Sequence, residues 1–159
     1  DGCTVYEDRP GACRIYPPGR AAMNLGGADR PAREKFFLVR ESHCRGFEEE
    51  REWTAAEWMS SEGLEDYNAM NDRWLRILTS TRSLGSNADA ERKVAMFYMA
   101  SYNLDRFRDF VFKSPFLDRF DVDAGTRERI ASDDTALMLF AFDWLRFALF
   151  GEDTMKVRQ

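Results

Sequence analysis

The sequence is poor in the side chains that most often build catalytic and metal sites. Its 159 residues include three cysteines and a single histidine, His43. An odd number of cysteines cannot all pair within the chain, and so few in a chain of this length argue against a secreted fold held together by disulfides. Glycine-rich phosphate loops of the P-loop or Rossmann type are also missing, because the Gly26–Gly27 pair lacks the rest of either motif.

Neither charge nor hydropathy points to a nucleic acid or a membrane. The chain has 23 Lys and Arg against 28 Asp and Glu, a net charge of −5, whereas a protein that neutralises phosphates needs a basic surplus. The most apolar run, residues 136–150, contains Asp143 and Arg146 and is shorter than the roughly 20 residues of a membrane-spanning helix. We therefore expect no nucleic-acid partner, no membrane span and a reduced, cytoplasmic protein, with the oligomeric state left open.

What the sequence does have is bulky core material. Apolar residues make up 44% of the chain, and Phe alone occupies 13 positions, which is enough for a domain with its own core. From residue 53 onward the apolar residues recur at helical spacing. We predict a mainly α fold, in which an irregular cysteine-rich lobe (1–52) packs on a helical bundle (53–151), followed by a tail (152–159).

Local signals predict where the helices begin and end. Thr54 and Glu57 match a capping box, and Asn103 is another good N-cap residue. The last helix should end at Gly151, and because it is apolar on nearly all sides it is the expected central core helix. The predicted helices cover 54–63, about 64–82, about 88–102, 103–111, a turn opened by Ser114 and Pro115, about 124–131, and a last one from Ser132 or Asp133 to 150.

The first 35 residues are rich in glycine and proline. Proline removes a backbone donor and glycine weakens regular structure, so long helices or strands are not expected there. Residues 35–39 form a short apolar run, which fits a buried strand or an extended segment. A segment of this kind needs another restraint, and a metal bound by Cys3 and Cys13 would supply one because ligation energy also acts as folding energy.

All three thiols lie in the first third of the chain, at Cys3, Cys13 and Cys44. Thiolates are preferred ligands of zinc and of iron–sulfur clusters. Neighbouring zinc ligands usually stand two to four residues apart, whereas nine residues separate Cys3 from Cys13. From spacing alone, metal ligation and buried or idle cysteines both remain open.

The segment C-x-V-Y-E-x-R-P-x-x-C-R, from Cys3 to Arg14, carries a resemblance to a known family. It resembles the second half of the cysteine-cluster proteins of the YkgJ type, which are described as zinc- or iron-chelating domains and include flagellin lysine N-methylases. The similarity extends from Cys3 to about Gly151. Further matching segments are Tyr16-Pro17, His43-Cys44-x-Gly46-Phe47, Glu52-Trp53-Thr54-x-x-Glu57-Trp58 and Tyr67-Asn68-x-Met70-Asn71.

This resemblance implies a metal site and suggests an activity. It makes Cys3, Cys13 and Cys44 ligands of an iron–sulfur cluster or zinc, and it implies a methyl transfer from S-adenosylmethionine to lysines of a protein substrate. The family's opening motif, C-x2-C-x2-C-C, has no counterpart here, and the chain starts at Asp1. We therefore expect an N-terminally truncated fragment, whose three thiolates cannot close a four-coordinate site alone.

His43 precedes Cys44, which suggests a Cys–His nucleophile. Adjacent side chains in an extended chain point to opposite faces, however, so this pair is disfavoured. His43 is expected instead as a structural side chain, as a fourth metal ligand, or as a hydrogen-bond partner of a thiolate or its ligands.

Arg9 and Arg14 lie on either side of Cys13. A neighbouring cation lowers the pKa of a thiol and stabilises a negatively charged cluster. The alternative is that Arg9 fixes the loop by pairing with one of the two acidic residues before it. Tyr6 and Tyr16 are expected to shield the site from water.

Other polar patterns have structural interpretations that we favour. Asp133 and Asp134, like Asp121 and Asp123, could form an acid–base pair or a metal site. Asp133 and Asp134 stand at a helix start, however, where acidic residues favour the helix dipole, so capping is expected. Residues 104–120 mix aromatic and basic side chains like a single-strand nucleic-acid platform, but three aspartates there nearly cancel the charge. Core packing is therefore expected. Asp143 and Arg146, three residues apart in the last helix, are expected to form a buried or half-buried ion pair.

Two functions therefore remain open. The first is a metal-chelating cysteine-cluster protein, part of a lysine N-methylase-like enzyme. The alternative is a metal-free helical scaffold or interaction module, whose cysteines are reduced and buried.

Overall fold

The structure is a computed structural model that describes residues 3–23 and 33–158. Within these residues there are eight α-helices, one short 3-10 helix and two strands. The predicted mainly α fold is therefore confirmed. The Gly26–Gly27 pair lies outside the described residues.

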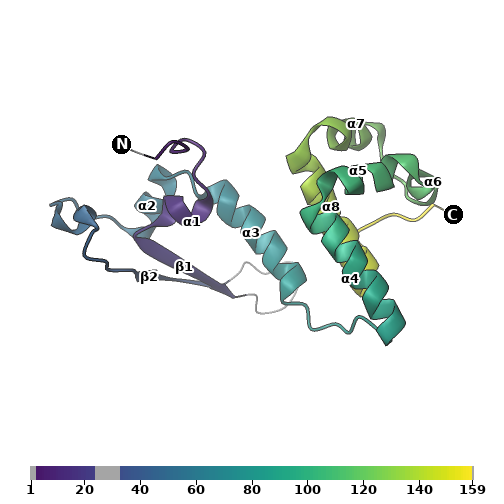
Figure 1. The fold of residues 1–159 in the computed structure, drawn as a ribbon, viewed down its shortest axis with the longest axis horizontal. Helices are drawn as coiled ribbons and strands as arrows, with labels where there is room; N and C mark the ends of the chain where they lie inside the picture. Colours follow the sequence, from purple (N-terminus) through teal and green to yellow (C-terminus); the bar gives the residue numbers. More distant parts are fainter. Residues whose placement is uncertain (1–2, 24–32, 159) are drawn as a thin grey trace. The chain divides into compact units, whose positions relative to one another are not determined.

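The chain folds as two compact units, Asp1–Thr79 and Ser80–Gln159. Figure 1 shows a small sheet together with helices in the first unit, and helices without a sheet in the second. The boundary predicted from the sequence lies after residue 52, where the cysteine-rich segment ends. The two compact units divide at a different place in the sequence, and the predicted boundary stays a prediction.

The first unit contains an antiparallel hairpin. Strand β1 pairs with strand β2, so that Pro18 lies opposite Leu38 and Met23 opposite Arg33. The sequence left two forms open for residues 35–39, a buried strand or an extended segment. All residues of β2 are exposed, so the run is extended but is not a buried strand. The elements are α1 (Gly11–Ile15), β1 (Pro18–Met23), β2 (Arg33–Leu38), the 3-10 helix η1 (Arg45–Glu48), α2 (Ala55–Ser61) and α3 (Glu65–Leu78).

The capping box predicted for α2 is present. The hydroxyl of Thr54 accepts a hydrogen bond from the Glu57 amide (3.2 Å), and the Glu57 carboxylate accepts one from the Thr54 amide (2.9 Å). Gly63 adopts a positive φ of 60° after the helix, which favours glycine. Helix α3 ends at Leu78, about one turn earlier than predicted. The Thr79 hydroxyl, just beyond this end, bonds back to the Leu75 carbonyl (2.7 Å).

Each long helix of the second unit begins at a side-chain cap. Asn103 caps α5 as predicted, and Asp133 caps α8 by accepting hydrogen bonds from the amides of Thr135 and Ala136. Gly151, with φ of 64°, ends α8. The elements are α4 (Asn87–Tyr102), α5 (Leu104–Lys113), α6 (Phe116–Arg119), α7 (Ala124–Ser132) and α8 (Asp134–Phe150).

Helix α8 is the centre of the second unit's core, as predicted from its composition. Leu137, Ala141 and Leu145 on α8 are fully buried. Against this helix, Phe107 and Phe110 each place their rings 5.3 Å from the ring of Trp144. Phe107, Phe110 and Phe116 therefore pack in the core, as expected from the sequence, whereas Phe112 is exposed.

The first unit, by contrast, has almost no core. Among its described residues the buried apolar side chains are Met59, Leu64 and Ile77, and all of the others belong to the second unit. Strands β1 and β2 and helix α1 contribute no buried side chain. The hydrophobic contribution to folding grows with buried apolar area, so the first unit is much less stabilised by burial than the second.

The last residues close back on the second unit. Val157 forms an isolated antiparallel bridge with Phe120, and the amide of Arg158 donates to the carbonyl of Arg119 (2.8 Å). Met155 is buried. Among the described helices, none has the length and apolar character required to cross a membrane.

Candidate thiol site

The three cysteines are free thiols at or near the surface of the first unit. Cys3 and Cys13 are exposed, and Cys44 is half-buried. Cys13 lies on the short helix α1, and Cys44 immediately precedes η1. Free cysteine is normally among the most buried residue types, so none of these thiols is explained as core packing.

Cys44 lies in a cluster of polar side chains with Tyr16, Glu41 and His43. The Tyr16 hydroxyl donates a hydrogen bond to the carboxylate of Glu41, and the Cys44 side chain lies close enough to raise the pKa of Tyr16. Glu41 Oε2 is 3.3 Å from the Tyr16 hydroxyl and 3.2 Å from His43 Nε2. The rings of Tyr16 and His43 are parallel within 4°, with centroids 6.3 Å apart. His43 is therefore a partner of Glu41 and Tyr16, and its side chain is 73% exposed.

This cluster raises the pKa of Tyr16 to about 12. Partial burial is the largest cause, because it penalises the charged phenolate. The neighbouring side chains of Cys44 and Glu41 act in the same direction, because a second anion is disfavoured beside them. Tyr16 is therefore a neutral hydroxyl, able to donate a hydrogen bond, over the whole physiological pH range.

Arg9 and Arg14 anchor the N-terminal loop to the end of α2. Arg9 pairs with Glu62 (3.1 Å), and its guanidinium lies 3.8 Å from the centroid of the Tyr6 ring. Arg14 donates to the backbone carbonyls of Glu7 (2.6 Å), Arg9 (2.8 Å) and Glu62 (3.3 Å). Arg9 thus pairs with Glu62, which is distant in sequence, and not with the two acidic residues that precede it. Tyr6 packs on Arg9.

The described residues do not form a closed metal site. Among residues 3–23 and 33–158, no group of three or more His, Cys, Asp or Glu side chains is placed so as to hold a metal ion. Cys3, Cys13 and Cys44 are therefore not assembled around one point in this conformation. A metal bound by all three thiolates therefore requires a rearrangement of their loops.

Glu41 is the member of the cluster that sequence reasoning missed, and Tyr16 was expected only as a shield. The sequence held no clear signal for Glu41, because residues 41–44 form a turn, in which the Cys44 amide donates to the Glu41 carbonyl (3.1 Å). This turn places the side chains of Glu41 and His43 next to each other.

A groove of about 320 Å³ lies beside helix α1. Its polar lining includes Arg20, Asn68 and Asp72, and Arg20 is held by Asp72 (2.9 Å) and by Glu34 (2.7 Å). The remaining lining residues are Gly11, Ala12, Ile15, Ala22, Leu64, Asn71 and Leu75.

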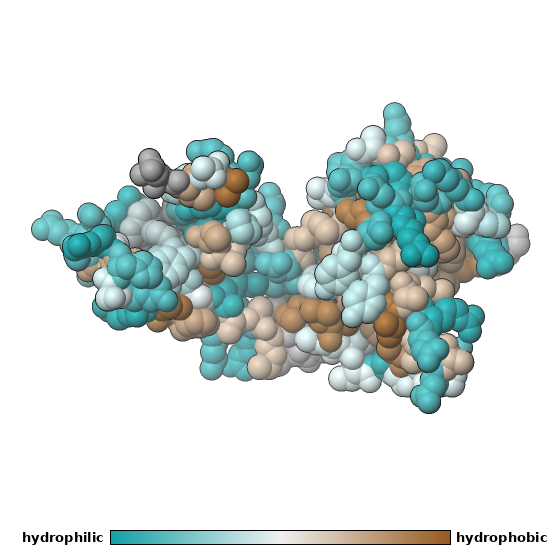
Figure 2. Space-filling model, in the orientation of Figure 1, coloured by the Kyte–Doolittle hydropathy of each residue, from teal (hydrophilic) through white to brown (hydrophobic). Residues whose placement is uncertain are grey.

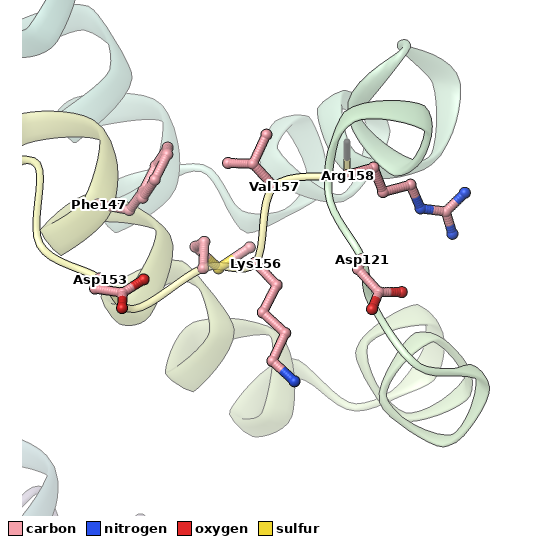
Figure 3. Close-up of a pocket in the computed structure, with 7 residues that line it drawn as sticks. Asp121, Phe147, Asp153, Lys156, Val157 and Arg158 are labelled. Atoms are coloured by element: carbon pink, nitrogen blue, oxygen red, sulfur yellow. The ribbon is translucent and has the colours of Figure 1, made fainter.

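A larger open cavity, about 670 Å³, lies in the second unit beneath its last residues (Figure 3). Figure 3 shows that Lys156 and Arg158 extend in different directions and that the carboxylates of Asp121 and Asp153 lie apart. These charged groups do not converge on one point, so the cavity has no recognisable catalytic arrangement. Its lining residues are Asp121, Phe147, Asp153, Met155, Lys156, Val157 and Arg158.

Two further carboxylates singled out from the sequence, Asp123 and Asp143, have structural roles. Asp123 caps α7, and hydrogen bonds from the hydroxyl and amide of Thr126 lower the pKa of its carboxyl. Asp143 lies 3.9 Å from Arg146, whose closer partner is Glu152 (2.7 Å). The Arg146 side chain is mostly buried and that of Asp143 is half exposed, so the pair is half-buried, one of the two predicted forms.

Comparison with known proteins finds no matching family model, no similar curated protein and no similar solved structure. The resemblance to the YkgJ-type cysteine-cluster proteins therefore stays a prediction that rests on its motifs.

Proposed function

We propose that the first unit is a thiolate metal-binding lobe, with Cys3, Cys13 and Cys44 as ligands of zinc or of an iron–sulfur cluster. The observation that supports this proposal is the combination of surface thiols with a nearly absent core. We also propose a reducing, cytoplasmic setting, since the three thiols are free.

A unit of this size needs a restraint other than burial. Small domains bury too little apolar surface for stability and commonly rely on disulfides, metals or a partner. No disulfide joins the three cysteines in this structure. Metal ligation contributes directly to folding free energy, and it would tie α1, the first loop and the segment before η1 together.

The three thiolates leave one ligand of a four-coordinate metal site to be assigned. Three thiolates provide three of the four donors of a structural zinc site. His43, exposed and adjacent to Cys44, is a candidate fourth donor. Arg9 and Arg14 hold the loop between Cys3 and Cys13 against Glu62, which restricts how far these two thiols can move.

Methyl transfer from S-adenosylmethionine to protein lysines is a further proposal that rests on the family resemblance alone. Neither cavity described above carries a feature that identifies a methyl-donor site. This activity is therefore tested separately, with S-adenosylmethionine labelled on its methyl group and a mixed protein substrate.

The experiment that tests the metal proposal is the measurement of zinc, iron and acid-labile sulfide per chain after anaerobic purification. It is made on residues 1–159 and on the complete gene product, with Cys3→Ser, Cys13→Ser and Cys44→Ser, and with Ser42→Ala as a control that alters an exposed neighbour of Cys44 without removing a thiol. We expect stoichiometric metal that each cysteine variant loses and the control keeps. Absence of metal from both proteins, or retention by all three cysteine variants, overturns the proposal.

A second candidate function, an interaction module, is favoured by the exposed apolar side chains of the first unit. Met23, Phe37 and Leu38 are all more than half exposed. A partner that covers them would supply the burial that the unit lacks. Under this alternative the chain contains no metal, and the hydrogen-exchange protection of the first unit rises only when the partner is added.

A further inference from the structure

The two faces of the β1–β2 hairpin have different environments. On the inner face, Arg20 bonds to Asp72 of α3, and Arg20 and Ala22 line the groove between the hairpin and α3. Because side chains alternate along a strand, the register places the other set on the opposite face. This outer face consists of Gly19, Ala21 and Met23 on β1 and Arg33, Lys35 and Phe37 on β2.

The outer face is exposed, and it combines apolar and cationic groups. Phe37 is 54% exposed and Met23 is 62% exposed. Figure 2, which colours each residue by its hydropathy, shows apolar (tan to brown) residues at the surface where Figure 1 draws the hairpin. Arg33 and Lys35 are also exposed, and neither forms an ion pair with another described residue. In contrast, Arg20 on the inner face pairs with two carboxylates.

Strand β2 is an open edge. The sheet has two strands, and no backbone hydrogen bond joins the outer edge of residues 33–38 to another described segment. Strand β1 packs against α1, so β2 is the more accessible of the two strands. An open edge presents unpaired amides and carbonyls that an extended peptide can bind by strand addition.

We propose that β2 binds an acidic segment of another protein as a third, antiparallel strand. Opposite side chains on one face of an antiparallel pair lie close together, and opposite charges stabilise the pair. A strand antiparallel to β2 meets Phe37, then Lys35, then Arg33 on the outer face. The partner segment therefore has the pattern apolar-x-acidic-x-acidic, with one apolar side chain against Phe37 and two carboxylates against Lys35 and Arg33.

Charge also argues against a second copy of this chain as the occupant. An antiparallel pair of β2 strands from two copies brings Lys35 and Arg33 of one copy near the same cations of the other, which is destabilising. Lysine on an edge strand is a common device against self-association. The same cations favour an acidic partner, so self-pairing is disfavoured and strand addition by an acidic segment is favoured.

The test uses two synthetic peptides and fluorescence anisotropy. The probe is acetyl-Thr-Val-Thr-Glu-Thr-Glu-Thr-amide with a fluorophore, and the matched control peptide has lysine at both glutamate positions. We expect the acidic peptide to bind the full chain about tenfold more tightly at low salt, because two opposite-charge pairs are replaced by two like-charge pairs. Binding should slow hydrogen exchange at alternate amides of β2.

Variants of the chain test the same charge pairing by changing the protein instead of the peptide. The double variant Arg33→Glu, Lys35→Glu should reverse the preference, so that the lysine peptide binds more tightly; this gain also shows that the variant is folded. Arg73→Glu, at an exposed cation on α3, should leave the preference unchanged. Equal binding of both peptides, binding of neither, or a dimer of the chain that the acidic peptide does not dissociate overturns the proposal.

Discussion

Arg20 on β1 donates two hydrogen bonds to the carboxylate of Asp72 on α3, at 2.9 and 3.0 Å, across 52 positions of sequence. The same guanidinium donates to Glu34 on β2 at 2.7 Å. The Arg20 side chain is only 9% exposed, so these two carboxylates, and little water, balance its positive charge. In a unit with very few buried apolar side chains, this ion-pair network links the hairpin to α3.

The first prediction is that Asp72→Asn destabilises the first unit. The variant leaves a mostly buried guanidinium with one carboxylate, and losing a hydrogen-bonded charged partner costs about 1–3 kcal/mol. The free energy of unfolding is measured by urea denaturation, with hydrogen exchange used to assign the change to the first unit. The control is Glu48→Gln, which breaks the exposed pair with Arg45 and should cost less than about 0.5 kcal/mol. Equal effects of the two variants would contradict this account.

The second prediction concerns the titration of Tyr16, whose pKa lies at about 12 rather than at the usual 10.0. Because the folded state raises the pKa, the neutral phenol contributes stability that is fully present below pH 10 and is lost as the pH rises towards 12. Ultraviolet titration at the tyrosinate band, compared with Tyr16→Phe, should show this late ionisation. Cys44→Ser removes the thiolate charge but keeps a hydrogen-bonding group, so it should shift the pKa of Tyr16 towards 10. An unchanged pKa in Cys44→Ser contradicts the predicted contact.

The third prediction concerns the capping box of α2 and acid. Hydrogen bonds from the amide and hydroxyl of Thr54 lower the pKa of Glu57 below 4.5. A carboxylate with a depressed pKa contributes stability that is present above its unfolded pKa and is lost as the pH falls through the folded one. Helix α2 should therefore fray below about pH 4.5, as seen by amide chemical shifts. Glu57→Gln should weaken the cap at neutral pH and remove this pH dependence, whereas Glu65→Gln, at an exposed residue of α3, should leave it in place.

The helical part of this fold could be predicted because its signals are local. Thr54, Asn103 and Asp133 cap the amides of residues two or three positions ahead, and Gly151 ends α8 within one turn. Each of these features depends on a few neighbouring residues, so the sequence contains all of the information needed. The same holds for the burial of α8, which follows from its apolar composition.

The first unit could not be predicted in this way because its contacts join distant positions. Arg9 pairs with Glu62 across 53 positions, and Tyr16 meets Glu41 across 25. No local pattern specifies either partner. The apolar run of β2 was ambiguous for a related reason, since a short apolar segment shows no period that distinguishes a buried strand from an exposed edge. The three thiols were found from their residue type, but their surroundings were not.

The last prediction is that the two units respond separately to loss of core side chains. Phe107 is 0% exposed and its ring contacts those of Phe110 and Trp144, so Phe107→Ala should lower the free energy of unfolding of the second unit by about 3–5 kcal/mol. Native-state hydrogen exchange should show faster exchange throughout residues 80–158 and unchanged rates in α3. The matched control is Tyr98→Ala, at an aromatic residue that is 60% exposed, for which the change should stay within about 0.5 kcal/mol. If Phe107→Ala accelerated exchange equally in α3, the two units would form one cooperative fold, and the weak core of the first unit would no longer require a metal or a partner.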